Sequence, residues 1–483
     1  ERHGAGDGFA GDGIVVEGGG SLADIRRGHG QAAANRGVPL FDRIGLGIVL
    51  PVVAEGRKET LAGFNLEFIA VNHSIPDALA VVIRSKAGSI LHTGDFKMDQ
   101  LPLDGRLTDL RAFARVGEEG LDLFMSDSTN ADVPGFTPLE KEIGPVIENV
   151  IARSKKRVIV ASFSSHVHRV QQVVDAAKAN HRKVALVGRS MVRNMQIAIE
   201  LGYLKAETDD FVDLKQAANM PDDKVVYMST GSQGEPMAVL ARMANLEHDI
   251  EIGEGDTVIL ASSLIPGNEN AVYRVIDGLT KLGANVVHKG NAKVHVSGHA
   301  AAGELLYCYN IVKPKYAMPI HGEWRHLKAN AQLAIESGVP RENAFIIENG
   351  IVVDLIDHVA EVVGSVPCGF VYVDGQSIGD ITESSLKDRR ILGEEGFISV
   401  FVVVEAQSGK IISGPDIHAR GFNEDEALFD EVKKEIEKAL ARAVADGIDG
   451  THQLQQVVRR TIGNWVGQKH RRRPMIVPVV VEV

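Results

Sequence analysis

The sequence is poor in cysteine, has no long apolar run and carries no excess of basic residues. Its two cysteines are too few for a disulfide framework, so we expect buried free thiols in a reducing cytoplasm. No apolar stretch is long enough to cross a bilayer, and the Gly-rich polar start does not resemble a signal peptide, so we expect a cytoplasmic protein without a membrane segment. The formal net charge of −12 argues against a broad basic face that coats nucleic acid, although basic groups could still be confined to a channel.

The composition predicts an ordinary globular protein of two or three domains, because 44% of the 483 residues are hydrophobic and 24% are charged. Residues 1–50 differ from the rest, since the stretch from Glu1 to about Arg36 is rich in Gly, Ala and Arg and contains few large apolar residues. We interpret this segment as atypical, and either disordered or out of frame.

Residues 137–290 alternate between apolar runs of strand length and amphipathic stretches of helical length, which predicts a mostly parallel sheet with helices. The expected strands are 157–163, 183–187, 224–229 and 256–262, and the expected helices lie near 138–155, 167–179, 190–201, 234–244 and 268–282. From about residue 396 the pattern predicts a small α+β domain. Its expected elements are a strand, a long amphipathic helix over 424–446, a helix near 451–466 and a Val-rich strand at 475–483.

Two polar motifs follow the first clear strand and the hairpin after it. His73 comes after the alternating strand at 64–70, in a loop where an imidazole could bind a metal, although a lone histidine is more often structural. Asp95 follows Gly94, whose flexibility allows a sharp turn that projects the carboxylate from the strand end. The two oxygens of Asp95 could serve two cations, and an Asx-turn is an equal alternative.

Three further motifs begin loops or helices after strands. Asp127 lies in Ser-Asp-Ser-Thr-Asn, which taken alone favours a helix cap over hydrogen bonds that orient histidine ligands. His166, His168 and Arg169 stand at the start of a helix, where imidazoles and free N–H groups could bind phosphate. Ser232 has a similar position, because it follows the expected strand at 224–229. Each of these signals is weak by itself.

The last two motifs carry three histidines. In His295-Val-Ser297-Gly298-His299 the small residues allow the backbone to approach a phosphate closely. His321 follows a strand and precedes a glycine, which suits a metal ligand. For either motif taken alone, a buried structural histidine is about as good an interpretation.

In their order along the chain, these motifs resemble those of ribonuclease J, a bacterial family in the β-CASP group of metallo-β-lactamase-fold nucleases. The resemblance rests on NHSIPD, HTGDFK, SDSTN, SSHVHR, HVSGH and PIHGE, and it runs from about residue 56 to the C-terminus. It implies an α/β protein in which residues 51–135 and 300–385 form a metallo-β-lactamase αββα sandwich. Residues 136–299 would be an inserted β-CASP α/β domain, and residues 396–483 a small α+β C-terminal domain.

The resemblance also implies roles for single residues. His73 and His321 would be zinc ligands, and Asp95 would be the carboxylate shared by two zinc ions. Asp127 would support a ligand histidine, and His299 would lie at the scissile phosphate. The residues that would grip RNA phosphates, including a 5′-monophosphate, are His166, His168, Arg169, Ser232, His295, Ser297, Gly298 and His299.

By the same resemblance the protein would be a 5′→3′ exoribonuclease, an endoribonuclease or both, acting in RNA maturation and decay. It would form homodimers or homotetramers. The histidine at position 321 indicates RNA rather than DNA as the substrate, because DNA-directed relatives usually lack it.

The sequence departs from this family in one respect. A His-x-His-x-Asp-His motif that supplies four zinc ligands upstream of His73 is absent, and its nearest remnant is His3 with Asp7. A catalytically impaired RNA-binding scaffold is therefore an alternative to the enzyme. A small-molecule metallohydrolase of the same fold is a second alternative, although it would not need the insertion at 130–300.

Overall fold

The computed structural model describes residues 53–235, 238–262, 265, 268–374, 377–379, 382–405, 408, 410–422, 426–448 and 450–483. Contacts divide the chain into two compact units, Glu1–Val366 and Pro367–Val483. The segment 1–50, which we interpret as disordered or out of frame, lies outside the described residues, so that interpretation stays a prediction.

A six-stranded mixed sheet in the first unit has the strand order β1-β2-β3-β4-β5-β11. Its strands are β1 (Lys58–Leu61), β2 (Phe64–Ala70), β3 (Leu79–Arg84), β4 (Ser89–His92), β5 (Leu123–Asp127) and β11 (Tyr316–Ile320). Strands β1 to β4 pair antiparallel, whereas β5 pairs in parallel with both β4 and β11. Strands β2, β4, β5 and β11 therefore run in one direction, and their carboxyl ends lie at the same edge.

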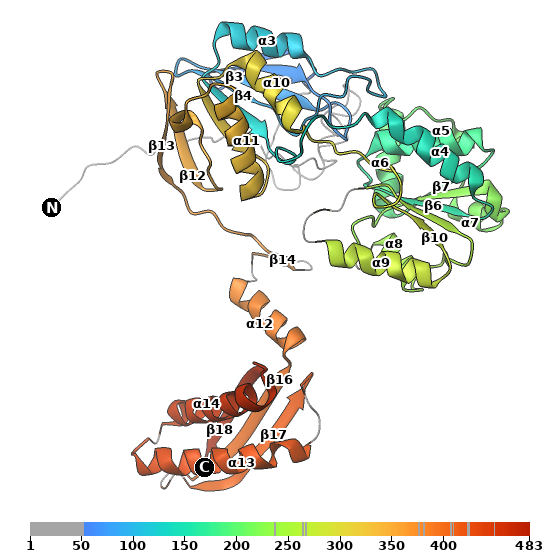
Figure 1. The fold of residues 1–483 in the computed structure, drawn as a ribbon. Coiled ribbons are helices and arrows are strands. Elements are labelled where there is room, and N and C mark those ends of the chain that lie inside the picture. Colours follow the sequence, from blue (N-terminus) through green and yellow to red (C-terminus); the bar gives the residue numbers. More distant parts are fainter. Residues whose placement is uncertain are drawn as a thin grey trace. The chain divides into compact units, whose positions relative to one another are not determined.

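Apolar side chains cover both faces of this sheet. Three helices pack on one face, where Phe113, Leu305 and Ala334 join a core with sheet residues such as Leu91 and Phe124. These helices are α3 (Leu110–Glu119), α10 (Ala302–Val312) and α11 (Trp324–Glu336). On the other face, a second core joins β5 and β11 to a hairpin of β12 (Ile351–Ile356) and β13 (Val359–Ser365). Figure 1 shows this layering.

A second sheet in the same unit has five strands, all parallel, in the order β10-β9-β6-β8-β7. Its strands are β6 (Val158–Ala161), β7 (Lys183–Val187), β8 (Val225–Ser229), β9 (Thr257–Leu260) and β10 (Asn285–Val287). Strands β6, β8 and β9 are buried throughout, as expected for a parallel sheet covered on both faces.

Helices cover both faces of the parallel sheet (Figure 1). One face carries α4 (Ile143–Arg153), α5 (Val167–Ala179) and α6 (Arg189–Glu200). The other face carries α7 (Leu214–Ala218), α8 (Val239–Ala244) and α9 (Glu269–Lys281). A short 3-10 helix, η2 (Glu140–Glu142), precedes α4. The predicted strands and helices of residues 137–290 are confirmed, although α4 and α8 each begin five residues later than expected.

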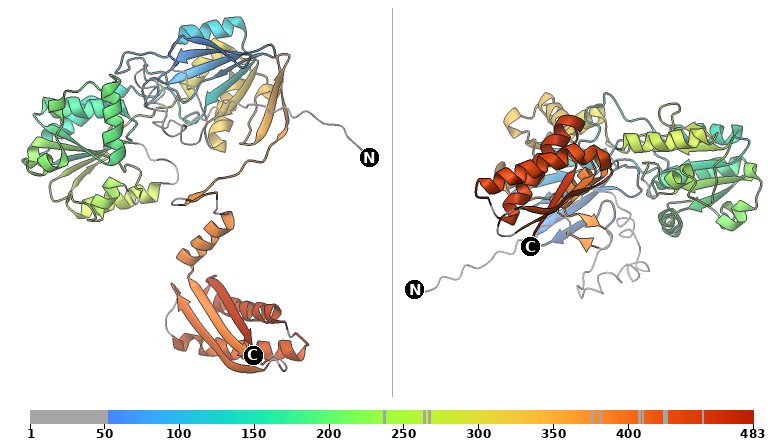
Figure 2. Two further views of the ribbon diagram at one scale, coloured as in Figure 1. Left: turned by 180° about the vertical axis from the view of Figure 1, so that it is seen from behind. Right: turned by 90° about the horizontal axis from the view of Figure 1, so that it is seen from below.

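The second unit holds a three-stranded sheet in the order β17-β16-β18. Its strands are β16 (Phe397–Val404), β17 (Ile411–Arg420) and β18 (Met475–Glu482). Helices α13 (Asp430–Ala445) and α14 (Thr451–His470) pack on this sheet through an apolar core that includes Ile398, Ile436 and Ile462 (Figure 2). The helix α12 (Glu383–Glu394) and the short strands β14 (Val373–Asp374) and β15 (Ser377–Ile378) precede them.

These elements confirm the α/β fold class and a separate small α+β unit at the C-terminal end. The boundaries at 135/136, 299/300 and 385/396 stay a proposal. Both cysteines are free thiols, as expected, but only Cys308 is buried. The expected burial is wrong for Cys368, which is exposed. Within the part of the chain that the structure describes, no helix is both long and apolar enough to span a membrane.

Candidate metal centre and catalytic site

The sheet topology brings the predicted site residues to one edge. His73, Asp95 and His321 come shortly after β2, β4 and β11, and Asp127 is the last residue of β5. Because these four strands run in the same direction, their following loops meet. His299 joins them from the loop that leads into α10.

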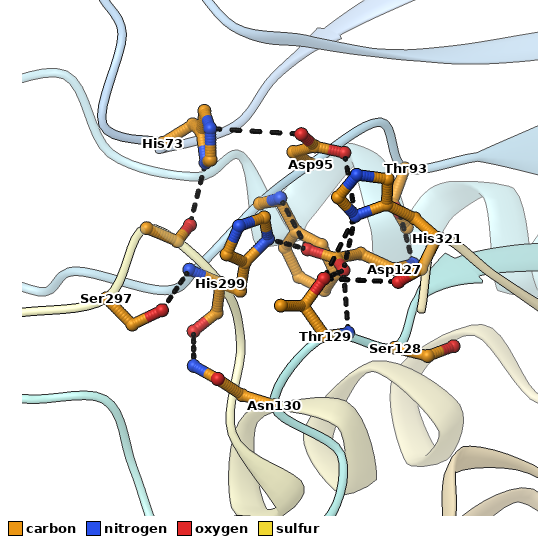
Figure 3. A network of polar contacts seen from close by, with 12 residues as sticks. His73, Thr93, Asp95, Asp127, Ser128, Thr129, Asn130, Ser297, His299 and His321 are labelled. Carbon is orange, nitrogen blue, oxygen red and sulfur yellow. Dashed lines mark hydrogen bonds and ion pairs between the residues drawn. The ribbon is translucent and has the colours of Figure 1, made fainter. Parts of the chain in front are cut away.

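Asp95 lies between two histidines (Figure 3). Its Oδ2 is 3.9 Å from Nε2 of His73, and its Oδ1 is 3.4 Å from Nδ1 of His321. One ligand atom from each of Asp95, Asp127, His299 and His321 falls within a group that spans no more than 4.8 Å. Imidazole nitrogens and carboxylate oxygens are common ligands of zinc. The predicted arrangement, in which one carboxylate faces two metal positions, is therefore compatible with this geometry.

His73 is held in the form that can bind a metal. Its Nδ1 donates to the carbonyl oxygen of Gly298 at 2.8 Å, so the proton stays on Nδ1 and Nε2 carries the lone pair, which the Ser74 hydroxyl approaches at 3.2 Å. Burial, together with the neighbouring His299, lowers the pKa of His73 to about 4. The ring is consequently neutral at physiological pH even without a metal.

Gly298 has a structural reason to be glycine. A Cβ atom at this position would lie 2.8 Å from both Cε1 and Nδ1 of His73. The structure therefore shows that the Gly298 backbone lies close to an imidazole ring. A contact of Gly298 with phosphate stays a prediction.

Asp127 is almost fully buried beneath the histidines. Its Oδ2 accepts a 2.6 Å hydrogen bond from Nδ1 of His299, and its Oδ1 lies 3.4 Å from Nδ1 of His321. The hydroxyl of Thr129 donates to the same Oδ1. Burial raises the pKa of Asp127, but the hydrogen bonds with His299 and His321 outweigh it and hold the pKa well below the ordinary value. Asp127 is therefore a carboxylate that orients two imidazoles.

His321 adopts a left-handed backbone conformation with φ of 53°. Its Nδ1 lies 2.9 Å from the hydroxyl of Thr129, and its carbonyl oxygen accepts from the backbone N–H of Ser128. The hydrogen bond with Asp127 raises the pKa of His321, and the Asp95 charge acts in the same direction. A cation bound at Asp95 would compete with this proton.

The carbonyl oxygen of His299 is held by two side chains that sequence reasoning did not single out as site residues. Asn130 Nδ2 donates to it at 3.0 Å, and the hydroxyl of Thr137 donates at 2.7 Å. The Ser297 hydroxyl accepts from the backbone N–H of His299 at 3.2 Å. Ser297 thus shapes the turn before His299, while its predicted contact with phosphate stays a prediction.

Other predicted phosphate ligands lie apart from this edge. His166 and His295 are buried, and their rings are 6.2 Å apart. The guanidinium group of Arg169 is fully buried and engaged with protein atoms. The geometry therefore gives Arg169 an internal role, and direct contacts of these three residues with RNA stay predictions.

His168 and Ser232 occupy two further places. Nε2 of His168 lies 3.3 Å from a carboxylate oxygen of Asp104. Ser232 is buried in the wall of a pocket beside the parallel sheet, which Ser262 and His288 also line. The structure does not bring these two residues to the histidine cluster, and their role as phosphate ligands also stays a prediction.

Four buried charged residues around the site were missed from the sequence: Lys97, Asp99, Glu140 and Glu304. The Glu304 carboxylate accepts from the backbone N–H groups of Met98, Thr137 and Ala301. A glutamate near the start of a helix is a capping signal that could have drawn attention to it. Lys97 belongs to the HTGDFK motif, but no local pattern shows that it is buried.

Comparison with known proteins agrees with the motifs. Residues 155–279 match the family "Ribonuclease J, beta-CASP domain", and residues 384–483 match "Ribonuclease J C-terminal domain". Residues 284–346 match "Zn-dependent metallo-hydrolase RNA specificity domain".

Curated relatives give the same picture over most of the chain. Ribonuclease J of Mycolicibacterium smegmatis is 52% identical over 89% of this chain and 77% of the relative. Ribonuclease J of Mycobacterium tuberculosis H37Rv is 50% identical with the same coverage, and ribonuclease J2 of Bacillus subtilis is 37% identical over 88% of this chain and 77% of the relative. The chain belongs to the ribonuclease J family.

Proposed function

We propose that this metal-dependent ribonuclease uses zinc, held by His73, Asp95 and His321, to cleave RNA from a 5′-monophosphorylated end. The observation that carries the proposal is the position of Asp95, whose two carboxylate oxygens face two different histidines. Two zinc ions at this place would supply a hydroxide at neutral pH and neutralise charge that develops on the phosphate.

Residues of the chain itself would hold protons at defined nitrogen atoms and transfer them. Asp127 holds the proton of His299 on Nδ1, which leaves Nε2 of that ring for the substrate. We propose that this nitrogen lies at the scissile phosphate and assists the departure of the leaving group. Burial and the neighbouring His299 keep the ring of His73 neutral, and the bond to Gly298 holds its one proton on Nδ1, so His73 can act as a ligand without first losing a proton.

The number of ligands supports a competing proposal. A catalytic zinc site usually has three protein ligands, and this proposal assigns only His73, Asp95 and His321 to both ions together. His3 and Asp7 lie outside the described residues. The alternative is therefore a chain that binds RNA and has lost turnover.

One experiment separates these proposals. Bound zinc is measured on the purified full chain, and cleavage is followed on 3′-labelled RNAs with a 5′-monophosphate or a 5′-hydroxyl, with Asp95→Ala as the inactive control. The enzyme proposal expects bound zinc, cleavage that Asp95→Ala abolishes, and preference for the 5′-monophosphate. Zinc well below one per chain, with RNA binding but no cleavage above the control, would establish the scaffold instead.

The direction of cleavage and the oligomeric state are part of the proposal. A 5′→3′ exonuclease releases mononucleotides from the 5′-end, whereas an endonuclease releases internal fragments, so the labelled products distinguish the two activities. We also propose a homodimer or homotetramer, which light scattering of the full chain tests. A monomeric mass at assay concentration would contradict that part.

A further inference from the structure

Four charged side chains form a buried group behind the metal centre. They are Lys97, Asp99, Glu140 and Arg169, and each is at most 5% exposed. Burying charges is costly unless they are paired and hydrogen-bonded. Two of the four are basic and two acidic, so the group is formally neutral.

Arg169 uses all three of its guanidinium nitrogens. Nε donates to Gln172, and Nη2 donates to Oε1 of Glu140 at 2.6 Å. Nη1 donates to the carbonyl oxygens of Ala261 and Val294. Val294 is the residue before the His295–His299 motif, so Arg169 directly holds the start of the segment that carries His299.

Glu140 continues the chain of contacts toward Asp95. Its Oε2 lies 3.7 Å from Nζ of Lys97, and its backbone N–H donates to Asp99 at 2.9 Å. Nζ of Lys97 also lies 3.6 Å from Asp99. Lys97 stands two residues after Asp95, and its backbone N–H donates to the carbonyl oxygen of Asn72, the residue before His73.

The buried group thus joins segments that are far apart in the sequence. Residues 95–99 carry Asp95, η2 carries Glu140, and residues 294–299 lead to His299. The hydrogen bond between Asp127 and His299 restrains the ring of His299, whereas the contacts of Arg169 restrain the backbone that delivers it.

We propose that Arg169 and Glu140 are positioning residues, which set the place of His299 relative to Asp95 by holding segment 294–299 against segment 95–99. In this role they act through His299 and not through their own contact with RNA or metal. The inference rests on the proposed function, because it takes His299 as the residue at the scissile phosphate. Misplacing a catalytic group by about 1 Å can lower a rate about 100-fold.

The parallel sheet β10-β9-β6-β8-β7 offers a control. Arg157 donates through Nε and Nη2 to the fully buried carboxylate of Asp256, at 3.3 and 2.9 Å. These residues directly precede β6 and β9, at the amino ends of the strands, whereas Arg169 lies beyond the carboxyl ends. Arg157 also lies 3.5 Å from Asp222, and its side chain is 25% exposed, so Arg157→Met removes a less buried ion pair far from His299.

The test compares Arg169→Met, Glu140→Gln, the double variant Arg169→Met/Glu140→Gln and the control Arg157→Met in the full chain. We expect all three single variants to lower the melting temperature. In the Arg169 and Glu140 variants kcat should fall about 10- to 100-fold with little change in KM, and Arg157→Met should keep its kcat. The double variant should regain stability, because it leaves no unpaired buried charge, but it should keep the low kcat.

A kcat that recovers together with the stability of the double variant would overturn the proposal, since the network would then be structural only. An equal loss of kcat in Arg157→Met would overturn it as well. Should Arg169→Met fail to fold, the isosteric Glu140→Gln carries the same comparison.

A second measurement does not depend on activity. Imidazole ¹⁵N–¹H spectra of the histidine-labelled chain report the bond between His299 and Asp127, with His299→Gln used to assign the signal. We expect the chemical shift of this signal to change in Arg169→Met and Glu140→Gln and to remain unchanged in Arg157→Met. If the wild type cleaves no RNA, the proposed function fails, and these spectra alone decide whether the buried group positions His299. Spectra that are unchanged in all variants would refute that role.

Discussion

The two sheets of the first unit both carry histidines beyond the carboxyl ends of their strands, but they place them in opposite environments. His299 and His321 are partly exposed and share the carboxylate of Asp127. His166 and His295, at the parallel sheet, are buried beside the positive charge of Arg169.

The difference in environment produces a difference in chemistry. The hydrogen bond with Asp127 raises the pKa of His321. Burial, followed by the charge of Arg169, lowers the pKa of His295 to about 3, and the same causes lower the pKa of His166. A nearby carboxylate is not sufficient by itself, because Oε1 of Glu140 lies 3.6 Å from Nε2 of the buried His166, whose pKa is nevertheless lowered. Partial exposure together with the hydrogen bond to Asp127 distinguishes His321.

Apart from the loss of activity in Asp95→Ala, the largest expected effect comes from removing the carboxylate of Asp127. Asp127→Asn keeps the shape of the side chain but takes away the charge that orients His299 and His321, and we expect cleavage to fall about 10²- to 10⁴-fold. Single-turnover cleavage of 5′-monophosphorylated RNA measures this loss, with the exposed Asp175→Asn as control. An Asp127→Asn rate within a factor of about two of wild type would remove Asp127 from the mechanism.

A smaller effect is expected from Gly298→Ala. The added methyl would meet the ring of His73 at 2.8 Å and displace it, so we expect zinc affinity to fall about 10- to 100-fold. Competition with a zinc-binding dye measures the affinity. Gly253→Ala is the matched control, because its Cβ would meet no atom within 4 Å. Equal affinities of the two variants would show that the contact between Gly298 and His73 does not position the ligand.

The buried histidines predict a pH effect on stability. Because the pKa of His295 is about 3 in the folded protein and 6.5 ordinarily, the unfolded chain binds a proton that the folded chain does not, and stability falls as pH drops below about 6.5. At pH 5 this cost is about 2 kcal/mol.

Replacing His295 removes this cost. When the pH falls from 7 to 5, the free energy of unfolding of the wild type should decrease by about 2 kcal/mol more than that of His295→Gln. Urea denaturation of the first unit measures this difference. The exposed His181→Asn is the control, since asparagine tolerates its φ of 54°. If the free energy of unfolding depends on pH in the same way in wild type and in His295→Gln, the imidazole of His295 is not kept neutral by burial.

The smallest effect is expected from Thr137→Val. This variant removes one of the two side-chain donors to the carbonyl oxygen of His299 and leaves Asn130 in place. A net loss of about 1 kcal/mol corresponds to a decrease in kcat of about fivefold. Thr280→Val, which loses a hydrogen bond within α9, should keep its kcat. If kcat of Thr137→Val decreases more than the cleavage rate of Asp127→Asn, the proposed order of the two effects is wrong.

Much of the fold was predictable because its signals are local. Helix α5 and strand β7 begin and end at the predicted residues, since apolar periodicity and strand length are read over a few neighbours. The order of six short motifs predicted the family and the residues His73, Asp95, Asp127, His299 and His321, which the structure brings to one edge.

The contacts among these residues were not predictable in the same way. His73 and Gly298 are 225 positions apart, and no local pattern relates a ring to that carbonyl. Arg169 has the local pattern of a phosphate ligand at a helix start, but its surroundings bury it. Burial depends on what packs against a residue from other segments.

By itself, the sequence determined the strands, the helices and the set of histidines and carboxylates from which a metal site can be built, because periodicity and motif order are properties of neighbouring residues. Only the tertiary structure decided which histidines share Asp127 and which lie beside Arg169 in the interior. The physical reason is that desolvation and charge pairing act through space, between residues that the chain itself keeps far apart.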